Sequence, residues 1–208
     1  MSAFTWPPES PTPAGAGPSG ASAGAPSPEG EHIPAAVLVP LFLAGDSPTP
    51  HVVLTKRRAD LRRHPGEISF PGGRQDAEDA TLLDTALREA EEEIGLPRTQ
   101  VKLLGELPPT STFATRYTIH PFVVQIPPGV AWRLSPKEVD AVLEPPLSDV
   151  RAGARKVPIE RRGITFQTDA YVVGDHTIWG ATARILTHLF ERLQPTTAGG
   201  RLSLTAEP

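Results

Sequence analysis

The side chains with the clearest potential for chemistry lie between residues 88 and 93, where the chain reads Arg-Glu-Ala-Glu-Glu-Glu. On a helix, Glu89 and Glu93 are one turn apart and share one flank, with Glu92 beside them. Carboxylates at this spacing repel each other by about 0.2–0.5 kcal/mol per pair, and the C-terminal end of a helix favours cations instead. A hard divalent cation removes both costs, because carboxylate oxygens are the ligands that Mg²⁺ and Mn²⁺ prefer. The spacing therefore indicates a metal site formed by Glu89, Glu92 and Glu93.

The same residues have a simpler interpretation as a solvated acidic face, in which Arg88 pairs with Asp84 or Glu92 at a spacing of four residues. The wider pattern favours the chemical interpretation. Residues 88–96 read REAEEEIGL. This run resembles the C-terminal half of the Nudix box, R-E-U-x-E-E-x-G-U, where U is aliphatic or small, and every defined position matches.

The N-terminal half of the box departs from the family pattern. That pattern has five residues between a Gly and a Glu, and seven residues between this Glu and the Arg. Here Gly73 is followed after five residues by Asp79, and eight residues separate Asp79 from Arg88. We therefore interpret Asp79 as the N-cap of a helix over residues 81–94, with Gly95 as its left-handed stop, rather than as a metal ligand.

Resemblance to Nudix proteins implies metal-assisted hydrolysis of a diphosphate bond. It makes Glu89 and Glu93 the main ligands of Mg²⁺ or Mn²⁺, and Glu92 a further ligand or the base that orients water. Arg88 is then expected to hold the acids in place.

A basic segment leads directly into the motif. Residues 56–63 contain five cations, followed by a histidine and then by Phe70-Pro71-Gly72-Gly73. A basic run alone is typical of a solvated loop, but cations beside a metal site suit a phosphorylated substrate. The segment resembles the extra motif that precedes the box in the coenzyme A pyrophosphatase branch of the family. That resemblance implies cleavage of coenzyme A to 3',5'-ADP and 4'-phosphopantetheine, with the substrate bound by Lys56, Arg57, Arg58, Arg62, Arg63, His64, Gly72 and Gly73.

Two other functions stay open. A Nudix hydrolase for ADP-ribose, dinucleotides or nucleoside triphosphates would keep the acidic helix without needing the basic motif. A ligand-sensing or RNA-associated module without turnover is the third reading. The presence of Arg88, Glu89, Glu92 and Glu93 together counts against it.

Periodicity predicts the elements that position these residues. Helices with an apolar stripe are expected over residues 81–94 and 178–193. Apolar or alternating runs predict strands over 35–44, 51–57, 101–107, 117–126 and 130–134, and a hairpin formed by 163–167 and 170–173. Ser135 to Glu138 is typical of a capped helix start, and the alternative makes Glu138 an additional acid near the metals. This order suggests an α+β fold with a mixed sheet between helices, and the family resemblance implies an α/β/α sandwich.

Composition sets the domain organisation. Residues 1–31 are rich in Pro, Ala, Gly and Ser with few large apolar side chains, so we expect a disordered tail there, a folded domain over 32–194 and a loose tail over 195–208. The first segment has neither the basic start nor the apolar run of a secretory signal, and no later run approaches the length of a transmembrane helix.

The remaining counts narrow the class of protein. The 208 residues include no cysteine, which excludes disulfides and a thiolate nucleophile and is compatible with the cytoplasm. A net charge of -4 argues against a general nucleic-acid binder. We expect a small nucleotide substrate of the coenzyme A type, no membrane or nucleic-acid partner, and a monomer or a homodimer.

Overall fold

The computed structural model describes residues 32–45, 47, 49–60, 66–112, 116–161 and 163–193. The tails predicted for residues 1–31 and 195–208 lie outside these described residues. Within the described ranges, no helix combines the length and the apolar character that crossing a membrane requires.

The described residues form helices and strands in the following chain order: β1 (Ile33–Phe42), β2 (His51–Val52), β3 (Leu54–Arg57), β4 (Ile68–Ser69), β5 (Gly72–Arg74), α1 (Leu82–Ile94), η1 (Arg98–Gln100), β6 (Lys102–Glu106), β7 (Thr110–Ser111), β8 (Tyr117–Gln125), β9 (Val139–Leu143), α2 (Leu147–Ala152), β10 (Ala154–Arg161), β11 (Ile164–Val173), β12 (His176–Trp179) and α3 (Gly180–Arg192).

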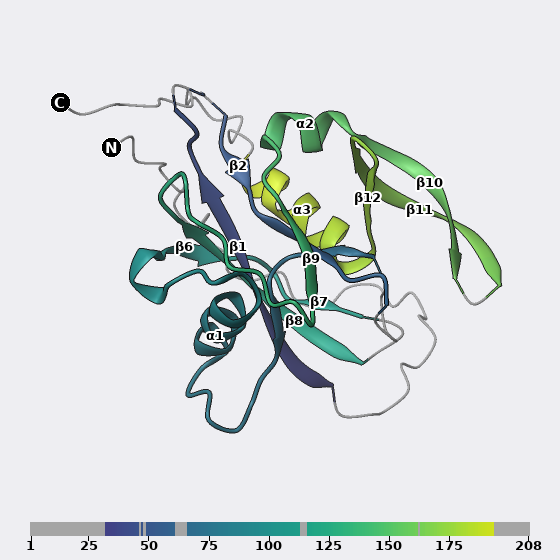
Figure 1. Cartoon of the computed structure of the whole chain (residues 1–208). Coiled ribbons are helices and arrows are strands. Elements are labelled where there is room, and N and C mark those ends of the chain that lie inside the picture. Colours follow the sequence, from purple (N-terminus) through teal and green to yellow (C-terminus); the bar gives the residue numbers. More distant parts are fainter. Residues whose placement is uncertain are drawn as a thin grey trace, which may run out of the picture.

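The largest sheet is built around β1 and β8, which run parallel from Ile33 opposite Tyr117 to Leu41 opposite Gln125. The strands β2 and β5 pair antiparallel with β1, and β6 and β7 pair antiparallel with β8. Two smaller sheets have the orders β4-β3-β9 and β10-β11-β12. The largest sheet is therefore mixed, because it contains both parallel and antiparallel pairs. The α+β class predicted from the sequence is confirmed (Figure 1).

Alternation along β1 explains why helices lie on both faces of this sheet. Ala36 and Leu38 belong to the core cluster that contains Ala86 and Ala90 of α1. Val39, the residue after Leu38, belongs instead to the core cluster that contains Leu186 and Phe190 of α3. A strand buried on both faces reads as a continuous apolar run, which is why the sequence shows no polar alternation there.

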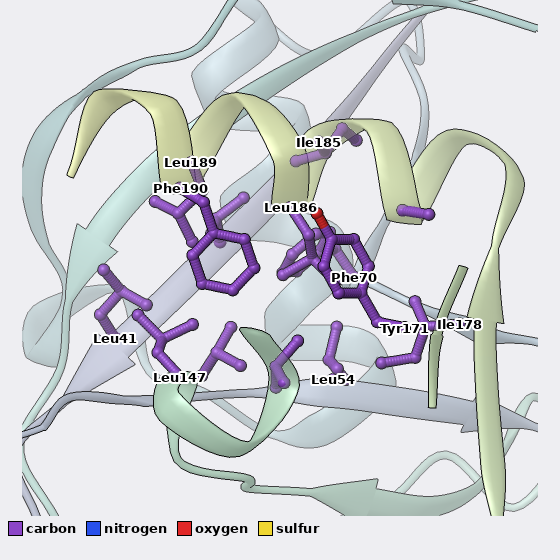
Figure 2. Packing of buried hydrophobic residues seen from close by; sticks show 14 of the residues in the cluster. Leu41, Leu54, Phe70, Leu147, Tyr171, Ile178, Ile185, Leu186, Leu189 and Phe190 are labelled. Carbon is purple, nitrogen blue, oxygen red and sulfur yellow. The ribbon is translucent and has the colours of Figure 1, made fainter. Parts of the chain in front are cut away.

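The α3 side of the core confirms the stripe predicted for the last helix. Ala183, Leu186 and Phe190 are buried, and Figure 2 shows Leu186 and Phe190 facing side chains of the sheet and of α2. Full burial of each Leu or Phe side chain of this kind stabilises the folded state by about 1.5–3 kcal/mol. The helix therefore mainly holds the smaller β10-β11-β12 sheet against the rest of the domain.

Several predicted strands differ from the structure. The run over 51–57 is divided into β2 and β3, and the short strand β7, which was not predicted, lies between the strands predicted over 101–107 and 117–126. The hairpin predicted within 163–173 is wrong, because Ile164–Val173 is one continuous strand and its hairpin partner is β10. β10 lies in the polar segment before β11. It was not predicted as a strand, because its sequence lacks the apolar alternation that marks one.

The strand predicted over 130–134 and the helix start predicted at Ser135 are both wrong. The chain there is irregular, and its backbone N–H groups at Arg133 and Ser135 donate to the Ile94 and Glu93 carbonyls at the end of α1 (3.0 and 2.8 Å). The Ser135 carbonyl then accepts from Glu138 and Val139 in a turn, and β9 follows directly. The segment caps α1 instead of joining a sheet, a contact that local patterning does not reveal.

Candidate active site

The acidic helix α1 is capped by a residue other than the one predicted. The Thr81 hydroxyl oxygen accepts a hydrogen bond from the Asp84 backbone N–H (3.1 Å), so Thr81 is the N-cap and the assignment of Asp79 to that role is wrong. Gly95 ends the helix with φ of 70°, the left-handed conformation predicted for it. A hydroxyl closer to the first turn caps the helix, which leaves the Asp79 carboxylate for another role.

Glu93 is buried where α1 packs against β5. Its side chain is 5% exposed, and Nη1 of Arg57 lies 4.0 Å from its Oε1. The Gly72 backbone N–H donates to Oε2 at 3.2 Å. Burial, followed by the charge of Glu89, raises the pKa of Glu93 to about 8, although Gly72 and Arg57 act in the opposite direction.

Glu89 lies one turn earlier on the same flank. Burial is the largest cause of its raised pKa, and the charges of Glu92 and Glu138 act in the same direction. Arg88 lowers this pKa without cancelling the effect of burial. The two carboxylates therefore share a partly buried site in which nearby cations do not offset the cost of their charge.

This donor set fits a hard divalent cation. Glu89 and Glu93 offer oxygen ligands whose charge a bound cation would stabilise. Glu92 stands apart, because its side chain is 61% exposed and its Oε2 accepts from Nη1 of Arg88 at 3.3 Å. Among the described residues, no three acidic or histidine side chains are already gathered as a metal site, so the structure presents a pair of ligands with Glu92 beside it.

Gly72 and Gly73 at the start of β5 bring the backbone against both acids. A Cβ on Gly73 would overlap the Glu89 carboxylate, and a Cβ on Gly72 would overlap the Ala36 carbonyl oxygen. Gly72 also has φ of 152°, which side chains rarely allow. Both glycines are therefore required for this close approach.

We expect Gly73→Ala to lower kcat by up to about a hundredfold, because the new methyl group displaces the Glu89 carboxylate and misplacement by about 1 Å has an effect of that size. The backbone at Gly73 is not in the left-handed region, so the melting temperature should change little. Steady-state kinetics and thermal unfolding check the two expectations. An unchanged kcat with unchanged metal dependence would contradict the placement of Glu89.

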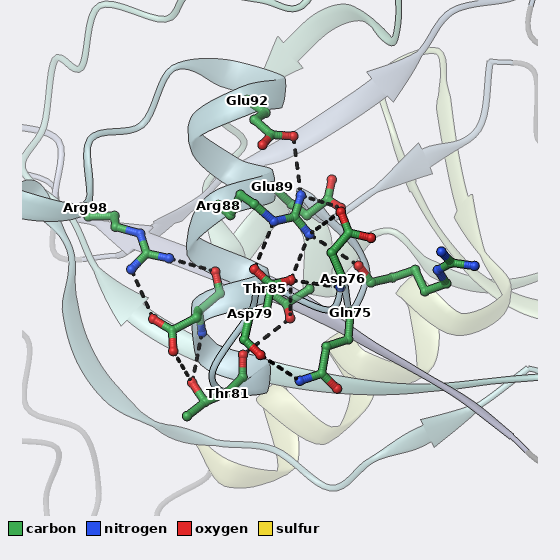
Figure 3. A network of polar contacts seen from close by, with 11 residues as sticks. Gln75, Asp76, Asp79, Thr81, Thr85, Arg88, Glu89, Glu92 and Arg98 are labelled. Carbon is green, nitrogen blue, oxygen red and sulfur yellow. Dashed lines mark hydrogen bonds and ion pairs between the residues drawn. The ribbon is translucent and has the colours of Figure 1, made fainter.

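Arg88 is the centre of a charge network that fixes these acids (Figure 3). Its Nε and Nη2 donate to the two carboxylate oxygens of Asp79 at 3.0 and 2.9 Å. Its Nη1 donates to Glu89 Oε1 at 3.2 Å as well as to Glu92. The paired contact with Asp79 holds the guanidinium in one plane, so that Nη1 is aimed at Glu89 and Glu92 of α1.

Asp79 is the anchor of this network. Its side chain is 5% exposed, and its Oδ2 also accepts from the Asp76 backbone N–H and the Thr85 hydroxyl, each at 3.0 Å. The Arg88 guanidinium holds the pKa of Asp79 well below its usual range, although burial acts in the opposite direction. Asp79 thus serves as the counter-ion of Arg88 despite its shifted position in the box.

A further acid faces this site from outside α1. Glu138 follows the turn that is hydrogen-bonded to the end of α1, and its charge raises the pKa of both Glu89 and Glu93. Because no helix begins at Ser135, the capping role considered for Glu138 is removed, and the alternative as an acid near the metals gains support. The sequence shows Glu138 two residues after Pro136. This pattern fits both a capped helix start and an acid near the metals, so the sequence did not separate the two interpretations.

The structure separates the members of the basic segment. Arg57 faces Glu93, whereas Lys56 pairs with Asp140 at 3.5 Å on the other side of β3. The Arg58 guanidinium is held by Asp60 (2.8 Å) and the Pro136 carbonyl (2.7 Å). Arg62, Arg63 and His64 lie outside the described residues.

A cavity of about 1280 Å³ opens beside the acids. Arg57, Gly72 and Gly73 line it on one side, and residues of β10, β11, β12 and α3 line it on the other. Among the latter, Arg155, Phe166 and Trp179 were not predicted as site residues. Their only sequence signal is an arginine and two aromatics near strands, which many folded proteins contain.

Comparisons with known proteins place the chain in a family and show its fold. The family model of the NUDIX domain matches residues 32–162. Nudix hydrolase NudL of Photorhabdus laumondii is 38% identical over 162 residues, which cover 77% of this chain and 84% of that protein. NudL of Salmonella paratyphi B is 40% identical over 157 residues, which cover 74% and 80%. The solved NUDIX domain of Shewanella oneidensis NrtR, complexed with ADP ribose, has a TM-score of 0.52 at 16% identity over 80% of this chain and 91% of that chain, which shows the fold.

Proposed function

Because this chain belongs to the Nudix family, we propose that it is a metal-dependent hydrolase of the diphosphate bond of coenzyme A and its derivatives, releasing 3',5'-ADP and 4'-phosphopantetheine. The observation that carries the proposal is the position of Glu89 and Glu93, which lie against Gly72 and Gly73 of β5. These two glycines line the large cavity. Buried carboxylates whose charge is unfavourable without a bound cation, and which lie next to a space for a phosphorylated ligand, are suited to metal-assisted hydrolysis.

Coenzyme A is favoured over smaller substrates by two features. The residues from Leu54 to Gly73 resemble the motif of the coenzyme A branch, and those of them that the structure describes include β3, β4 and the start of β5 beside the acids. The cavity also exceeds the range of about 300–1,000 Å³ typical of small-molecule sites. A substrate with long groups on both sides of its diphosphate would use that space.

The residues have separate tasks in the proposed reaction. Glu89 and Glu93 would hold Mg²⁺ or Mn²⁺, with Glu92 as a further ligand. When bound, such a cation supplies charge that offsets the phosphoryl oxygens and makes water more nucleophilic. Arg88 keeps Glu89 and Glu92 in position through its contact with Asp79, and Arg57 supports Glu93 and the diphosphate from the cavity side.

Glu138 is our candidate for the general base that takes the proton from water, with Glu92 as the alternative. Glu138 is exposed, it lies across from α1, and its charge raises the pKa of both Glu89 and Glu93. We expect Glu138→Gln to lower kcat by about 10²–10⁴-fold, the usual size of a general-base contribution. Asp140→Asn is the matched control, since Asp140 is a nearby exposed acid paired with Lys56. If Glu138→Gln keeps its kcat and Glu92→Gln loses it, the base is Glu92.

A substrate panel with product masses tests the proposal. Coenzyme A, an acyl-coenzyme A, ADP-ribose, a dinucleoside polyphosphate and nucleoside triphosphates are incubated with Mg²⁺ or Mn²⁺, and with a chelator as control. We expect the highest kcat/KM for coenzyme A or its acyl form, with 3',5'-ADP as a product and no turnover in chelator. A preference for ADP-ribose would overturn the coenzyme A assignment. Absence of turnover on the whole panel would favour a non-catalytic module.

A further inference from the structure

We propose that Arg155, Phe166 and Trp179 form a specificity subsite in which a nucleobase stacks on the aromatic side chains and Arg155 binds a phosphate carried on the ribose. The inference rests on the proposed function. It assigns selection among diphosphate substrates to the β10-β11-β12 sheet, away from the acids of α1.

Strand register places these side chains on one face of that sheet. Arg155 lies opposite Ala170, and Ala170 lies opposite Trp179 on the other neighbouring strand. Residues directly opposite in antiparallel strands share a face, as do alternate residues of one strand, so Phe166 lies on this face too. All three residues line the cavity. The small side chain of Ala170 leaves room between the arginine and the indole.

The aromatic side chains offer a stacking surface. The rings of Phe166 and Trp179 are 6.3 Å apart at 62°, an edge-on pair. Phe166 nevertheless remains 40% exposed while it lines the cavity. A planar base stacked on such a ring is worth a substantial part of a nucleotide's affinity, so a bound base explains why an aromatic side chain is presented here.

Arg155 provides positive charge that is left unpaired among the residues that the structure describes. Within the described ranges its guanidinium has no hydrogen bond or ion pair, whereas its neighbour Lys156 pairs with Asp169 at 3.1 Å. Strands two apart in a sheet are about 10 Å from each other, which is the length scale of one nucleotide. A base on Phe166 and Trp179 would therefore bring its ribose phosphate toward Arg155.

The described cations of the basic segment are less suited to this phosphate. Lys56 and Arg58 are held by Asp140 and Asp60 and do not line the cavity. Arg57 does line it but faces Glu93, where the diphosphate is expected. Among the described residues, Arg155 on β10 is therefore better placed for the phosphate outside the diphosphate than Lys56, Arg57 or Arg58.

Calorimetric titration of the full-length protein in chelator tests the subsite without turnover. The probes are adenosine 3',5'-bisphosphate and 5'-AMP. We expect the parent to bind the bisphosphate about ten- to a hundredfold more tightly, the effect of one charge-assisted contact. Arg155→Gln should remove this difference, and Lys156→Gln should keep it. Phe166→Leu should weaken both nucleotides, whereas Ile164→Ala, on the same strand at 67% exposure, should weaken neither.

Equal affinities of the parent for the two nucleotides would overturn the proposal, as would equal effects of the two charge-removing variants. Kinetics separate this result from a failure of the proposed function. If Arg155→Gln lowers kcat/KM for coenzyme A toward that for dephospho-coenzyme A, the subsite is supported in the working enzyme. If no diphosphate is hydrolysed but the bisphosphate preference depends on Arg155, the subsite stands and the proposed function fails.

Discussion

Replacing Glu93 with glutamine is expected to lower kcat by at least about a hundred- to a thousandfold, the size of effect seen when a group that stabilises transition-state charge is removed. The variant should still fold, because the amide has nearly the same volume and its oxygen can accept from the Gly72 N–H as Oε2 does now. Steady-state kinetics with titrated Mg²⁺ and Mn²⁺, together with thermal unfolding, check both parts. Normal turnover with the parent's metal dependence would contradict the site assignment.

The same variant should change how stability depends on pH. In the metal-free protein the pKa of Glu93 is raised from 4.5 to about 8, so between these values the folded state binds a proton that the unfolded state has released. Stability from this group is therefore full below about pH 4.5 and is lost as pH rises through about 8. Urea unfolding in chelator at pH 5 and 8 should show a smaller decline in Glu93→Gln than in the parent.

Glu92→Gln is the control for this measurement, because Glu92 is largely exposed. Removing the Glu92 charge relieves the raised pKa of Glu89 only in part, so the decline of Glu92→Gln between the two pH values should lie closer to that of the parent than the decline of Glu93→Gln does. Glu89 also has a raised pKa, so the slope in Glu93→Gln should be reduced rather than removed. An identical decline in parent and Glu93→Gln would show that burial of Glu93 does not have the effect inferred here.

Replacing Asp79 with asparagine is expected to have the largest effect on folding, a loss of about 2–4 kcal/mol in the free energy of unfolding. Removing one partner of a buried ion pair costs about 3–5 kcal/mol, and the value here is lower because Arg88 keeps 23% of its side chain exposed. Turnover should fall as well, because Arg88 would no longer be held in the plane that serves Glu89. Urea unfolding at neutral pH measures the first effect.

Asp76→Asn is the matched control, since Asp76 lies 3.7 Å from the same guanidinium but is 50% exposed, and exposed pairs contribute about 0–1 kcal/mol. Because the pKa of Asp79 is lowered in the folded state, its contribution is present above its unfolded pKa and is lost as pH falls through the folded value. The two variants should therefore converge in strong acid. Equal destabilisation of both at neutral pH would contradict the anchoring role.

The sequence predicted the parts of the fold whose signals are local. Gly95 was identified as the helix stop because only a residue that tolerates positive φ ends a helix in that way. The run at β1 was recognised because a strand buried on both faces must be apolar throughout. The strand over 130–134 and the helix at Ser135 were predicted wrongly, because their backbone partners are the carbonyls of α1, a long way off in the sequence.

For the candidate site, the sequence predicts the acids and the arginine from their spacing on one helix, and the two glycines from the motif that precedes that helix. Tertiary structure decided what each of them does. It buried Glu93 against Gly72 and left Glu92 exposed, and it made Asp79 the partner of Arg88. It also brought Arg155 and Phe166 into the same cavity as Gly73. The reason is that burial and charge compensation depend on which distant segments meet, and no periodicity within one segment carries that information.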